Sequence, residues 1–140
     1  MQIEDLYQDL IIEHGTKPRN FLELPNCSCS AEGYNPLCGD KLKMFVLLED
    51  ANKIKQITFV GQGCAISTAS ASILTQELSG LTIEQGLKIT HDFKETILGQ
   101  RDDCDLSQRL QTLANVKKYP SRIKCATLAW YAFSDALIKS

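Results

Sequence analysis

Two neighbouring runs of alternating apolar and polar residues constrain the fold more than any other feature of the sequence. Lys41 to Leu48 and Lys53 to Val60 each direct successive side chains to opposite faces, as strands do. The turn residues Asp50, Ala51 and Asn52 join them, and a connection this short joins antiparallel strands, because parallel pairing needs a long crossover. The sequence therefore predicts an antiparallel hairpin with one face on the core.

Helical spacing of apolar residues dominates the rest of the chain. Five segments show it: residues 3–14, 65–79, 83–97, 106–116 and 121–138. His14-Gly15 is expected to end the first helix, and Thr82 to Gln85 has the form of a capping box that opens the third. Residues 16–39 and 99–105 are predicted to be loops. Because the predicted strands come early in the chain and most of the predicted helices come late, the sequence predicts an α+β fold in a single domain, residues 1–140.

The composition is that of an ordinary globular protein, with 140 residues, 44% hydrophobic and 23% charged. A formal net charge of −2 without a basic block argues against nucleic acid as a partner. The apolar runs are far shorter than the roughly 20 residues that span a bilayer, so no membrane role is expected. The N-terminus is acidic and amphipathic, unlike a signal peptide. We therefore expect a cytoplasmic protein whose six cysteines are metal ligands or reactive thiols rather than disulfides.

Three of these cysteines occupy distinctive positions. Cys38 directly precedes the first predicted strand, and Cys64 lies where the second strand passes into a helix. Cys125 lies in the first turns of the last helix. A thiol at a helix N-terminus faces unpaired N–H groups and the positive end of the dipole, which favours the thiolate. Thiolate is both a metal ligand and a sulfur nucleophile, so these three cysteines are the candidate site residues.

Asp40 lies two residues after Cys38, and Gly39 between them lets the chain bend. Three sulfurs and one carboxylate oxygen would suit tetrahedral zinc, with bonds of about 2.3 Å and about 2.0–2.2 Å respectively. The same donors also suit iron–sulfur species. With a dication the set would keep a double negative charge, and three basic residues are expected to offset it: Lys41, Arg122 and Lys124.

Other interpretations of these cysteines are also open. A single free cysteine is often only a small buried core residue, although three in such contexts are less expected by chance. A structural zinc site is also open, but such sites usually pair their ligands as Cys-x-x-Cys. A cysteine hydrolase would need a histidine beside the thiol, and the only two, His14 and His91, lie outside any motif.

The remaining titratable candidates are expected to have no part in a site. Cys27 and Cys29 are interpreted as incidental loop residues, and the carboxylates around Cys104 disfavour its thiolate. His14 is predicted to interact with the dipole at the end of its helix, and His91 to lie on a helix surface.

Three segments, Asn35–Asp40, Gly61–Ser70 and Arg122–Trp130, together resemble the U-type iron–sulfur cluster assembly proteins. This group comprises IscU, the NifU N-terminal domain and SufU, and the resemblance runs over nearly the whole chain. It implies a small antiparallel sheet of about three strands packed against helices. Matched position by position, it implies four metal-binding residues: Cys38, Asp40, Cys64 and Cys125.

Within this group the sequence is more similar to SufU than to IscU. Lys124 stands where IscU has histidine, Asn115–Pro120 stands in the region of the IscU chaperone motif, and the gap between Cys64 and Cys125 is longer. The resemblance thus implies a zinc-dependent sulfurtransferase role, in which Cys38 takes persulfide sulfur from a SufS-type cysteine desulfurase. The sulfur would pass to apo iron–sulfur proteins or to the Suf assembly complex. The alternative is a scaffold that binds iron and assembles a [2Fe–2S] cluster on the same residues.

Overall fold

The computed structural model describes residues 2–101 and 105–139 and has an α+β fold, as predicted. Its three strands form one antiparallel sheet in the order β1-β2-β3: β1 (Cys29–Asn35), β2 (Asp40–Glu49) and β3 (Lys53–Gln62). The α-helices are α1 (Ile3–Thr16), α2 (Ala65–Leu78), α3 (Ile83–Ile97), α4 (Gln108–Leu113) and α5 (Ile123–Lys139). Two short 3₁₀ helices, η1 (Ala114–Lys118) and η2 (Pro120–Arg122), connect α4 to α5.

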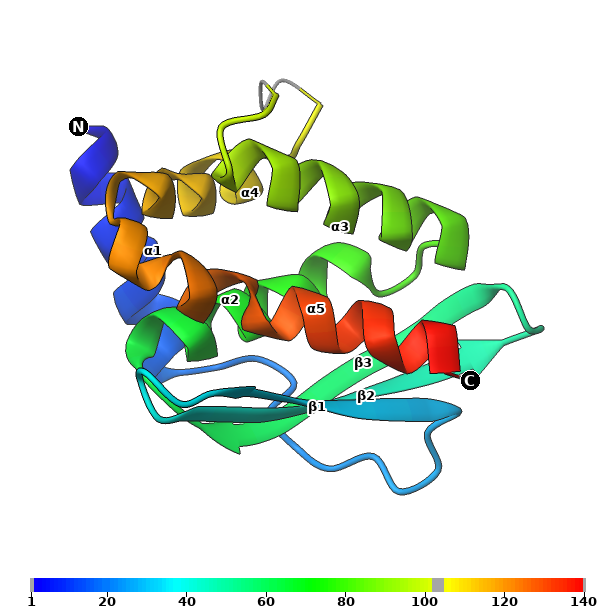
Figure 1. Ribbon diagram of the computed structural model, residues 1–140. Helices are drawn as coiled ribbons and strands as arrows, with labels where there is room; N and C mark the ends of the chain where they lie inside the picture. Colours follow the sequence, from blue (N-terminus) through cyan, green and yellow to red (C-terminus); the bar gives the residue numbers. More distant parts are fainter. Residues whose placement is uncertain (1, 102–104, 140) are drawn as a thin grey trace.

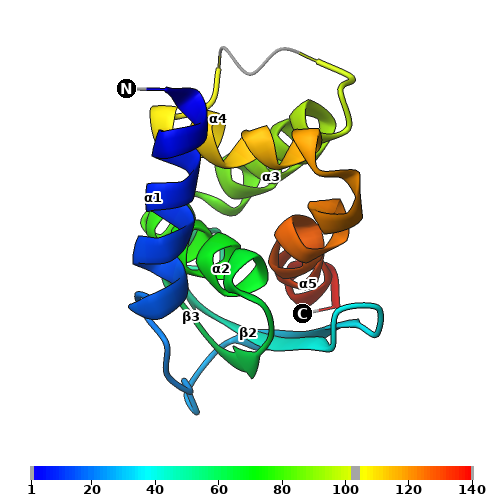
Figure 2. The same cartoon turned by 90° about the vertical axis from the view of Figure 1, so that its left-hand side faces the viewer.

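The helices lie in layers on one face of the sheet. Figure 1 shows α2 and α5 against this face, with α3 and α4 in a further layer above them. In the turned view of Figure 2, α1 stands along the side of α2. The buried apolar residues form a core cluster between the sheet and these helices.

The predicted hairpin is confirmed. Strands β2 and β3 pair in antiparallel register, with Met44 opposite Phe59 and Val46 opposite Ile57. These four side chains are completely buried, because alternation along each strand directs them to the face that the helices cover. The turn residues 50–52 lie between the strands, as expected.

The predicted loop over residues 16–39 is wrong in its last part, because Cys29–Asn35 forms the edge strand β1. Its side chains alternate between half-buried and exposed, so the strand lacks a run of large apolar residues that would mark it in the sequence. The strand forms by pairing with β2 and by close packing against α5. A Cβ on Gly33 would lie 2.9 Å from Leu128 Cδ1, so any larger residue would require the Leu128 side chain to shift.

Helix α1 extends to Thr16 and is therefore longer than expected, with Gly15 inside its last turn. A Cβ on Gly15 would lie 3.1 Å from Ala65 Cβ, and the glycine thus lets α1 come close to the start of α2. The capping box of α3 is confirmed, since Gln85 N donates to Thr82 Oγ1 at 3.1 Å and Thr82 N donates to Gln85 Oε1 at 3.0 Å.

A buried hydrogen-bonded contact joins α2 to α5. Trp130 Nε1 donates to Ser70 Oγ at 2.9 Å, and Ser70 Oγ donates to the carbonyl of Ala126 at 2.6 Å. Phe93 of α3 packs on the indole, with ring centroids 4.5 Å apart. Because buried hydrogen bonds and aromatic packing fix the two helices relative to each other, the start of α5 has a defined position beside the start of α2.

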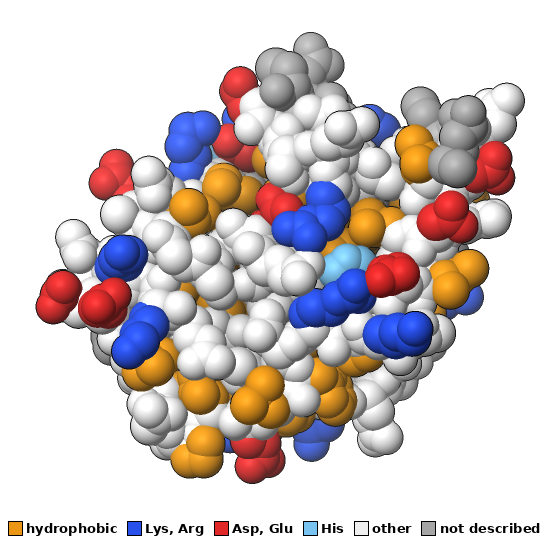
Figure 3. Space-filling model, turned by 180° about the vertical axis from the view of Figure 1, so that it is seen from behind, with side chains coloured by type: hydrophobic (Ala, Val, Ile, Leu, Met, Phe, Trp, Pro, Cys, Tyr) orange, Lys and Arg blue, Asp and Glu red, His pale blue; other side chains and the backbone are white. Residues whose placement is uncertain are grey.

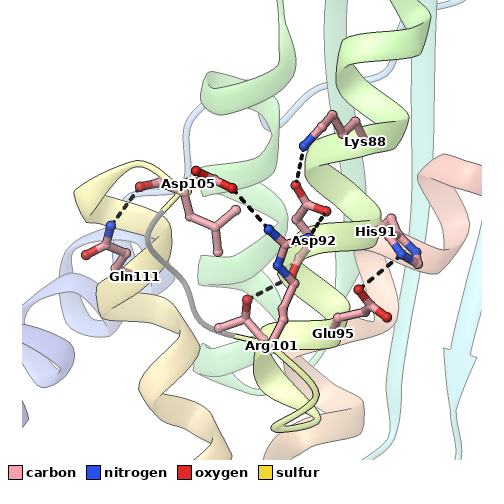
Figure 4. A network of polar contacts seen from close by, with 9 residues as sticks. Lys88, His91, Asp92, Glu95, Arg101, Asp105 and Gln111 are labelled. Carbon is pink, nitrogen blue, oxygen red and sulfur yellow. Dashed lines mark hydrogen bonds and ion pairs between the residues drawn. The ribbon is translucent and has the colours of Figure 1, made fainter.

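Ion pairs hold the segment after α3 against that helix (Figure 4). Asp92 is buried, and its two oxygens accept from Lys88 Nζ at 2.8 Å and from Arg101 Nη1 at 2.7 Å. Arg101 also contacts Asp105 at 3.1 Å. The predicted loop over residues 99–105 falls partly on 102–104, so the expectation for Cys104 lies outside the described residues.

The surface is mixed in charge. In Figure 3, basic and acidic side chains are interspersed over the face shown. Among residues 2–101 and 105–139, no helix is both long enough and apolar enough to span a bilayer.

Candidate metal centre

Three chain segments meet at one end of the sheet, on the left in Figure 1. They are the β1–β2 turn with Cys38 and Asp40, the junction of β3 and α2 with Cys64, and the first turn of α5 with Cys125. Ligand atoms of Cys38, Asp40 and Cys125 all lie within 4.8 Å of one another. The sulfurs of Cys38 and Cys125 are 3.2 Å apart.

Cys64 lies beside these three residues. It is the N-cap of α2, and its backbone N–H donates to Asp40 Oδ1 at 2.8 Å. Its thiol also contributes to the raised pKa of Cys125. The structure therefore brings the ligand atoms of Cys38, Asp40 and Cys125 together and places Cys64 beside them, while the role of all four residues as metal ligands stays a prediction.

Cys125 is completely buried, and burial raises its pKa well above the ordinary range. The contacts with Cys38, Asp40 and Cys64 add to the rise, because negative charges nearby disfavour a further thiolate. The expectation that the helix N-terminus favours a thiolate at Cys125 is thus outweighed by burial. A dication would act in the opposite direction, since it binds and stabilises thiolates.

Asp40 is also buried, and neighbouring groups fix its carboxylate. In addition to the Cys64 N–H, Asn35 Nδ2 donates to Asp40 Oδ2 at 3.4 Å. The same amide nitrogen lies 3.7 Å from Cys125 Sγ. Asn35 was not predicted as a site residue, although it begins the Asn35–Asp40 segment. It reaches Asp40 because the two residues are opposite each other in the β1–β2 register.

Two glycines shape the backbone around this carboxylate. A Cβ on Gly63 would lie 2.5 Å from Asp40 Oδ1 and 2.6 Å from Ser67 Oγ, so a side chain there would occupy the space of the carboxylate. Gly39 has a φ of +71°, the left-handed conformation that turns the chain between Cys38 and Asp40.

Cys38 differs from its neighbours because it is half-buried and lies on a turn rather than in a helix or strand. Arg122 Nη1 lies 3.8 Å from its sulfur. Hydrogen bonding with Cys125 raises the pKa of Arg122, and the charges of Cys38 and Cys64 contribute further. This guanidinium is therefore placed to offset negative charge on the sulfurs.

The two lysines are placed differently. Lys124 is exposed and lines a hollow beside the Cys38 turn, together with Leu37. Lys41 follows Asp40 in β2 and so points to the opposite face of the sheet, where it lines another hollow with Glu23. Lys41 therefore lies away from the thiols. That Arg122 and Lys124 offset the negative charge of the thiolates stays a proposal.

The donor set fits zinc. Tetrahedral zinc with bonds of about 2.3 Å to sulfur separates two thiolates by about 3.8 Å. The sulfurs of Cys38 and Cys125 are 3.2 Å apart, so a small outward movement of the half-buried Cys38 would reach this geometry. Cys64 lies beside this close set of three residues and would supply the third sulfur for four-coordination.

His14 lies in the last turn of α1, as expected, although its surroundings disfavour the charged form that would interact with the helix dipole. Its ring is buried, and Nδ1 lies 2.7 Å from Ser72 Oγ, which also accepts from the Arg19 N–H at 2.8 Å. Burial, followed by the charge of Arg19, lowers the pKa of His14 below its ordinary value of 6.5. The neutral imidazole is therefore favoured.

The other candidate ligands lie apart from the thiols. His91, Asp92 and Glu95 lie together, but both Asp92 oxygens already accept hydrogen bonds from cations, which leaves the group poorly suited to a metal. Cys29 begins β1, six residues from Asn35 and thus roughly 20 Å along the strand. Cys27 precedes it and is likewise remote.

Comparisons of sequence agree with this arrangement. Residues 6–126 match the family model described as NifU-like N terminal domain. The chain is 37% identical over 139 residues to the zinc-dependent sulfurtransferase SufU of Bacillus subtilis strain 168, covering 98% of this chain and 92% of that protein. It is 35% identical over 140 residues to the iron–sulfur cluster assembly scaffold protein IscU of Streptococcus pyogenes serotype M1, covering 99% and 87%.

Comparisons of structure give the same result. A Fervidobacterium islandicum AW-1 protein, proposed as an iron–sulfur cluster assembly scaffold of the SUF system, superposes with a TM-score of 0.87 and 30% identity, covering 96% of this chain and 98% of that one. The N-terminal part of a NifU-like protein from Brucella abortus shares the fold, with a TM-score of 0.83 at 18% identity over 98% and 95% of the two chains. The three-stranded sheet implied by the resemblance is confirmed, and the chain belongs to the NifU-like N-terminal domain family of iron–sulfur cluster assembly proteins.

Proposed function

We propose that this protein accepts persulfide sulfur on Cys38 from a cysteine desulfurase, at a zinc site formed by Cys38, Asp40, Cys64 and Cys125. The observation that carries the proposal is the contact between two unlike thiols. Cys38 is half-buried on a turn, whereas Cys125, 3.2 Å away, is buried in α5. One sulfur is thus free to move and be reached, while the rest of the site is anchored.

The anchored part consists of Asp40, Cys64 and Cys125. They lie on β2, at the start of α2 and on α5, elements that the core packing holds together. Zinc, when bound there, keeps the thiols deprotonated and less open to oxidation. Cys38 is the group that can leave this set at least cost, because only the Pro36–Gly39 turn must move.

Sulfur transfer requires no oxidant. The Cys38 thiolate attacks the outer sulfur of the desulfurase persulfide and forms a new S–S bond. The S–S bond of the donor breaks, and its electron pair stays on the desulfurase cysteine as thiolate. Arg122, 3.8 Å from Cys38, is placed to stabilise the anionic sulfur before and after transfer.

The surface beside Cys38 is suited to a docking desulfurase. Leu37, the preceding residue, is 80% exposed, and Tyr34 and Tyr131 are also exposed. These three residues line one hollow of about 320 Å³ with Lys124. Exposed apolar side chains next to a nucleophile are typical of a surface that a partner covers. The name of the Bacillus subtilis relative supports the zinc-dependent form of the proposal.

Sulfur acceptance is testable with a purified SufS-type desulfurase and cysteine as the sulfur source. Intact-mass analysis under non-reducing conditions should show one added sulfur on the wild type and on Cys27→Ser, a control thiol remote from the site. Cys38→Ser should accept none while keeping part of its zinc. Sulfur acceptance by Cys38→Ser at the wild-type level would contradict the proposal.

A scaffold function is the second candidate, because the same donors suit an iron–sulfur cluster and the Streptococcus relative is named a scaffold protein. Anaerobic reconstitution with iron and sulfide distinguishes the two. A stable visible absorption that survives desalting favours the scaffold, and colourless protein that retains zinc favours the sulfur acceptor.

A further inference from the structure

Strand β1 forms one edge of the sheet, because it lies at the end of the order β1-β2-β3. Helix α5 packs beside it (Figure 1). An edge strand has backbone N–H and C=O groups that point away from the sheet and can pair with another chain. The register of the sheet determines which residues of β1 carry these groups.

A hydrogen bond of Phe59 fixes the alternation. Phe59 N donates to the Asn20 carbonyl at 3.1 Å, so the backbone groups of Phe59 point away from β2. Such groups alternate between the two sides of a strand, and directly opposite residues of an antiparallel pair point either toward or away from each other. Phe59 is opposite Met44, which is opposite Ala31, so Met44 and Ala31 point toward each other. The neighbours of Ala31 in the alternation therefore point outward: Ser30, Glu32 and Tyr34.

These outward backbone groups have no partner among residues 2–101 and 105–139. No hydrogen bond reaches the outer side of Ser30, Glu32 or Tyr34. The same three residues are exposed, whereas the residues between them are half-buried. The outer edge of β1 is therefore an open template on which an extended segment can form a further strand.

Helix α5 supplies a wall beside this edge. One stripe of the helix, at positions i, i+3, i+4 and i+7, lines a hollow of about 320 Å³: Lys124, Thr127, Leu128 and Tyr131. The opposite wall is the end of β1 and the turn after it, residues 34–37. Because the side chains of a strand alternate, a strand added to β1 would direct every second side chain toward this hollow.

The place of Cys38 indicates which chain lies on the edge. Cys38 is three positions after the last residue of β1, and Leu37 beside it lines the same hollow. A desulfurase has to bring its donor sulfur to Cys38, so the segment that carries this sulfur has to pass the end of β1. The desulfurase is therefore the occupant that the position of the edge favours.

A second copy of this chain fits the edge less well. In a two-fold antiparallel pair, the register that uses all three outward residues places Ser30 opposite Tyr34 and Glu32 opposite itself. Like charges directly opposite each other on paired strands are destabilising. A segment with a basic residue at that position would instead be attracted to Glu32.

We propose that an extended segment of the cysteine desulfurase adds to β1 as a fourth strand when it delivers sulfur to Cys38. This inference rests on the proposed function and deepens it. The segment pairs with the outward groups of Ser30, Glu32 and Tyr34. On one face it places apolar side chains against Leu128 and Tyr131, and on the other face it places a basic side chain opposite Glu32.

Glu32→Pro tests the pairing, with Glu32→Ala as the matched control. Proline removes an N–H that points outward, so the bonds between β1 and β2 remain and the urea midpoint and zinc affinity should match the wild type. Both variants lose the carboxylate, but only proline loses the donor. Calorimetric titration of zinc-loaded protein with a SufS-type desulfurase should show affinity reduced about tenfold or more in Glu32→Pro and by less than about threefold in Glu32→Ala.

Amide hydrogen exchange of the wild type gives a second measurement, which needs no variant. Exchange proceeds in the complex with the desulfurase and is read by NMR after dissociation. The amides of Ser30, Glu32 and Tyr34 should exchange fast in the free protein and slow by about tenfold or more in the complex. Those of Ala31 and Gly33, which bond to β2, should be slow in both.

Four results would overturn the inference. Glu32→Pro could bind the desulfurase as the wild type does, or no more weakly than Glu32→Ala. The three amides could exchange at unchanged rates in the complex. A wild-type dimer in sedimentation that is lost in Glu32→Pro would show that a second copy occupies the edge. In each case the proposed function stands if the wild type accepts sulfur on Cys38, and a wild type that accepts none overturns both.

Discussion

The backbone N–H of Cys64 donates to the Asp40 carboxylate at 2.8 Å, across 24 positions in the sequence. This hydrogen bond connects the start of β2 with the start of α2, the two points from which an oxygen and a sulfur enter the site. It leaves the carboxylate oriented by the fold before any metal binds. The proposed site is therefore largely preformed, and Cys38 is its movable part.

Asp40→Ala should weaken both the fold and the metal site. The part-buried Cys64 N–H loses its acceptor, so the free energy of unfolding of the metal-free protein should fall by about 1–3 kcal/mol in urea titrations. Zinc affinity should fall as well, because the oxygen ligand is gone.

Asp40→Asn is the matched control for that variant, because its amide oxygen still accepts from the Cys64 N–H. Its metal-free stability should recover most of the loss while its zinc affinity stays low. If Asn destabilised the metal-free protein as much as Ala, the hydrogen bond would not be the cause.

Gly63→Ala should displace the carboxylate, because the new Cβ would lie 2.5 Å from Asp40 Oδ1 and 2.6 Å from Ser67 Oγ. Overpacking of this kind costs about 1–3 kcal/mol of stability, and the zinc affinity should fall with it. Adding Ser67→Ala should restore part of the stability and little of the affinity, since the contact with Asp40 remains. An unchanged zinc affinity in Gly63→Ala would contradict a role for Asp40 as a ligand.

His14 should make the stability depend on pH below neutrality. Because its pKa is lower in the folded protein than the ordinary 6.5, the unfolded chain binds the proton more readily. Its contribution to the free energy of unfolding is complete above about pH 6.5 and is lost as the pH falls through the folded-state pKa.

Urea titrations between pH 5 and 8 would measure this dependence. His14→Gln should flatten it, because the substitution removes the titrating imidazole. Equal slopes in the wild type and in His14→Gln would show that His14 is not the group responsible.

Asp92→Asn should lower stability without affecting the metal site. The substitution removes a buried charge paired with Arg101 and Lys88, at a cost of about 1–3 kcal/mol in the free energy of unfolding. Lys88→Met should cost less than about 1 kcal/mol, because the lysine side chain is largely exposed. Zinc affinity should match the wild type in both variants, and a loss there would contradict the separation of this network from the thiols.

The sequence pattern was enough to predict those parts of the fold in which neighbouring residues determine the structure. The β2–β3 hairpin follows from side-chain alternation and a short turn, and the start of α3 follows from the reciprocal bonds of Thr82 and Gln85. Strand β1 could not be predicted in this way, since Gly33 and its polar neighbours become a strand only through contact with β2 and α5.

The candidate site was likewise predictable from the sequence only in part. The glycine-rich and helix-opening contexts of Cys38, Cys64 and Cys125 were visible in the sequence and led to the hypothesis that the three share one site, but no local pattern can show that segments so far apart in the chain converge. Asn35 was missed, because its contact with Cys125 joins two segments that lie far apart in the sequence.

X-ray absorption at the zinc edge, on wild-type protein loaded with one equivalent of zinc, tests the central claim most directly. The proposed site predicts three sulfur neighbours at about 2.3 Å and one oxygen at about 2.0–2.2 Å, with one sulfur fewer in Cys38→Ser. A zinc shell of nitrogen and oxygen alone, or a shell unchanged in Cys38→Ser, would contradict it.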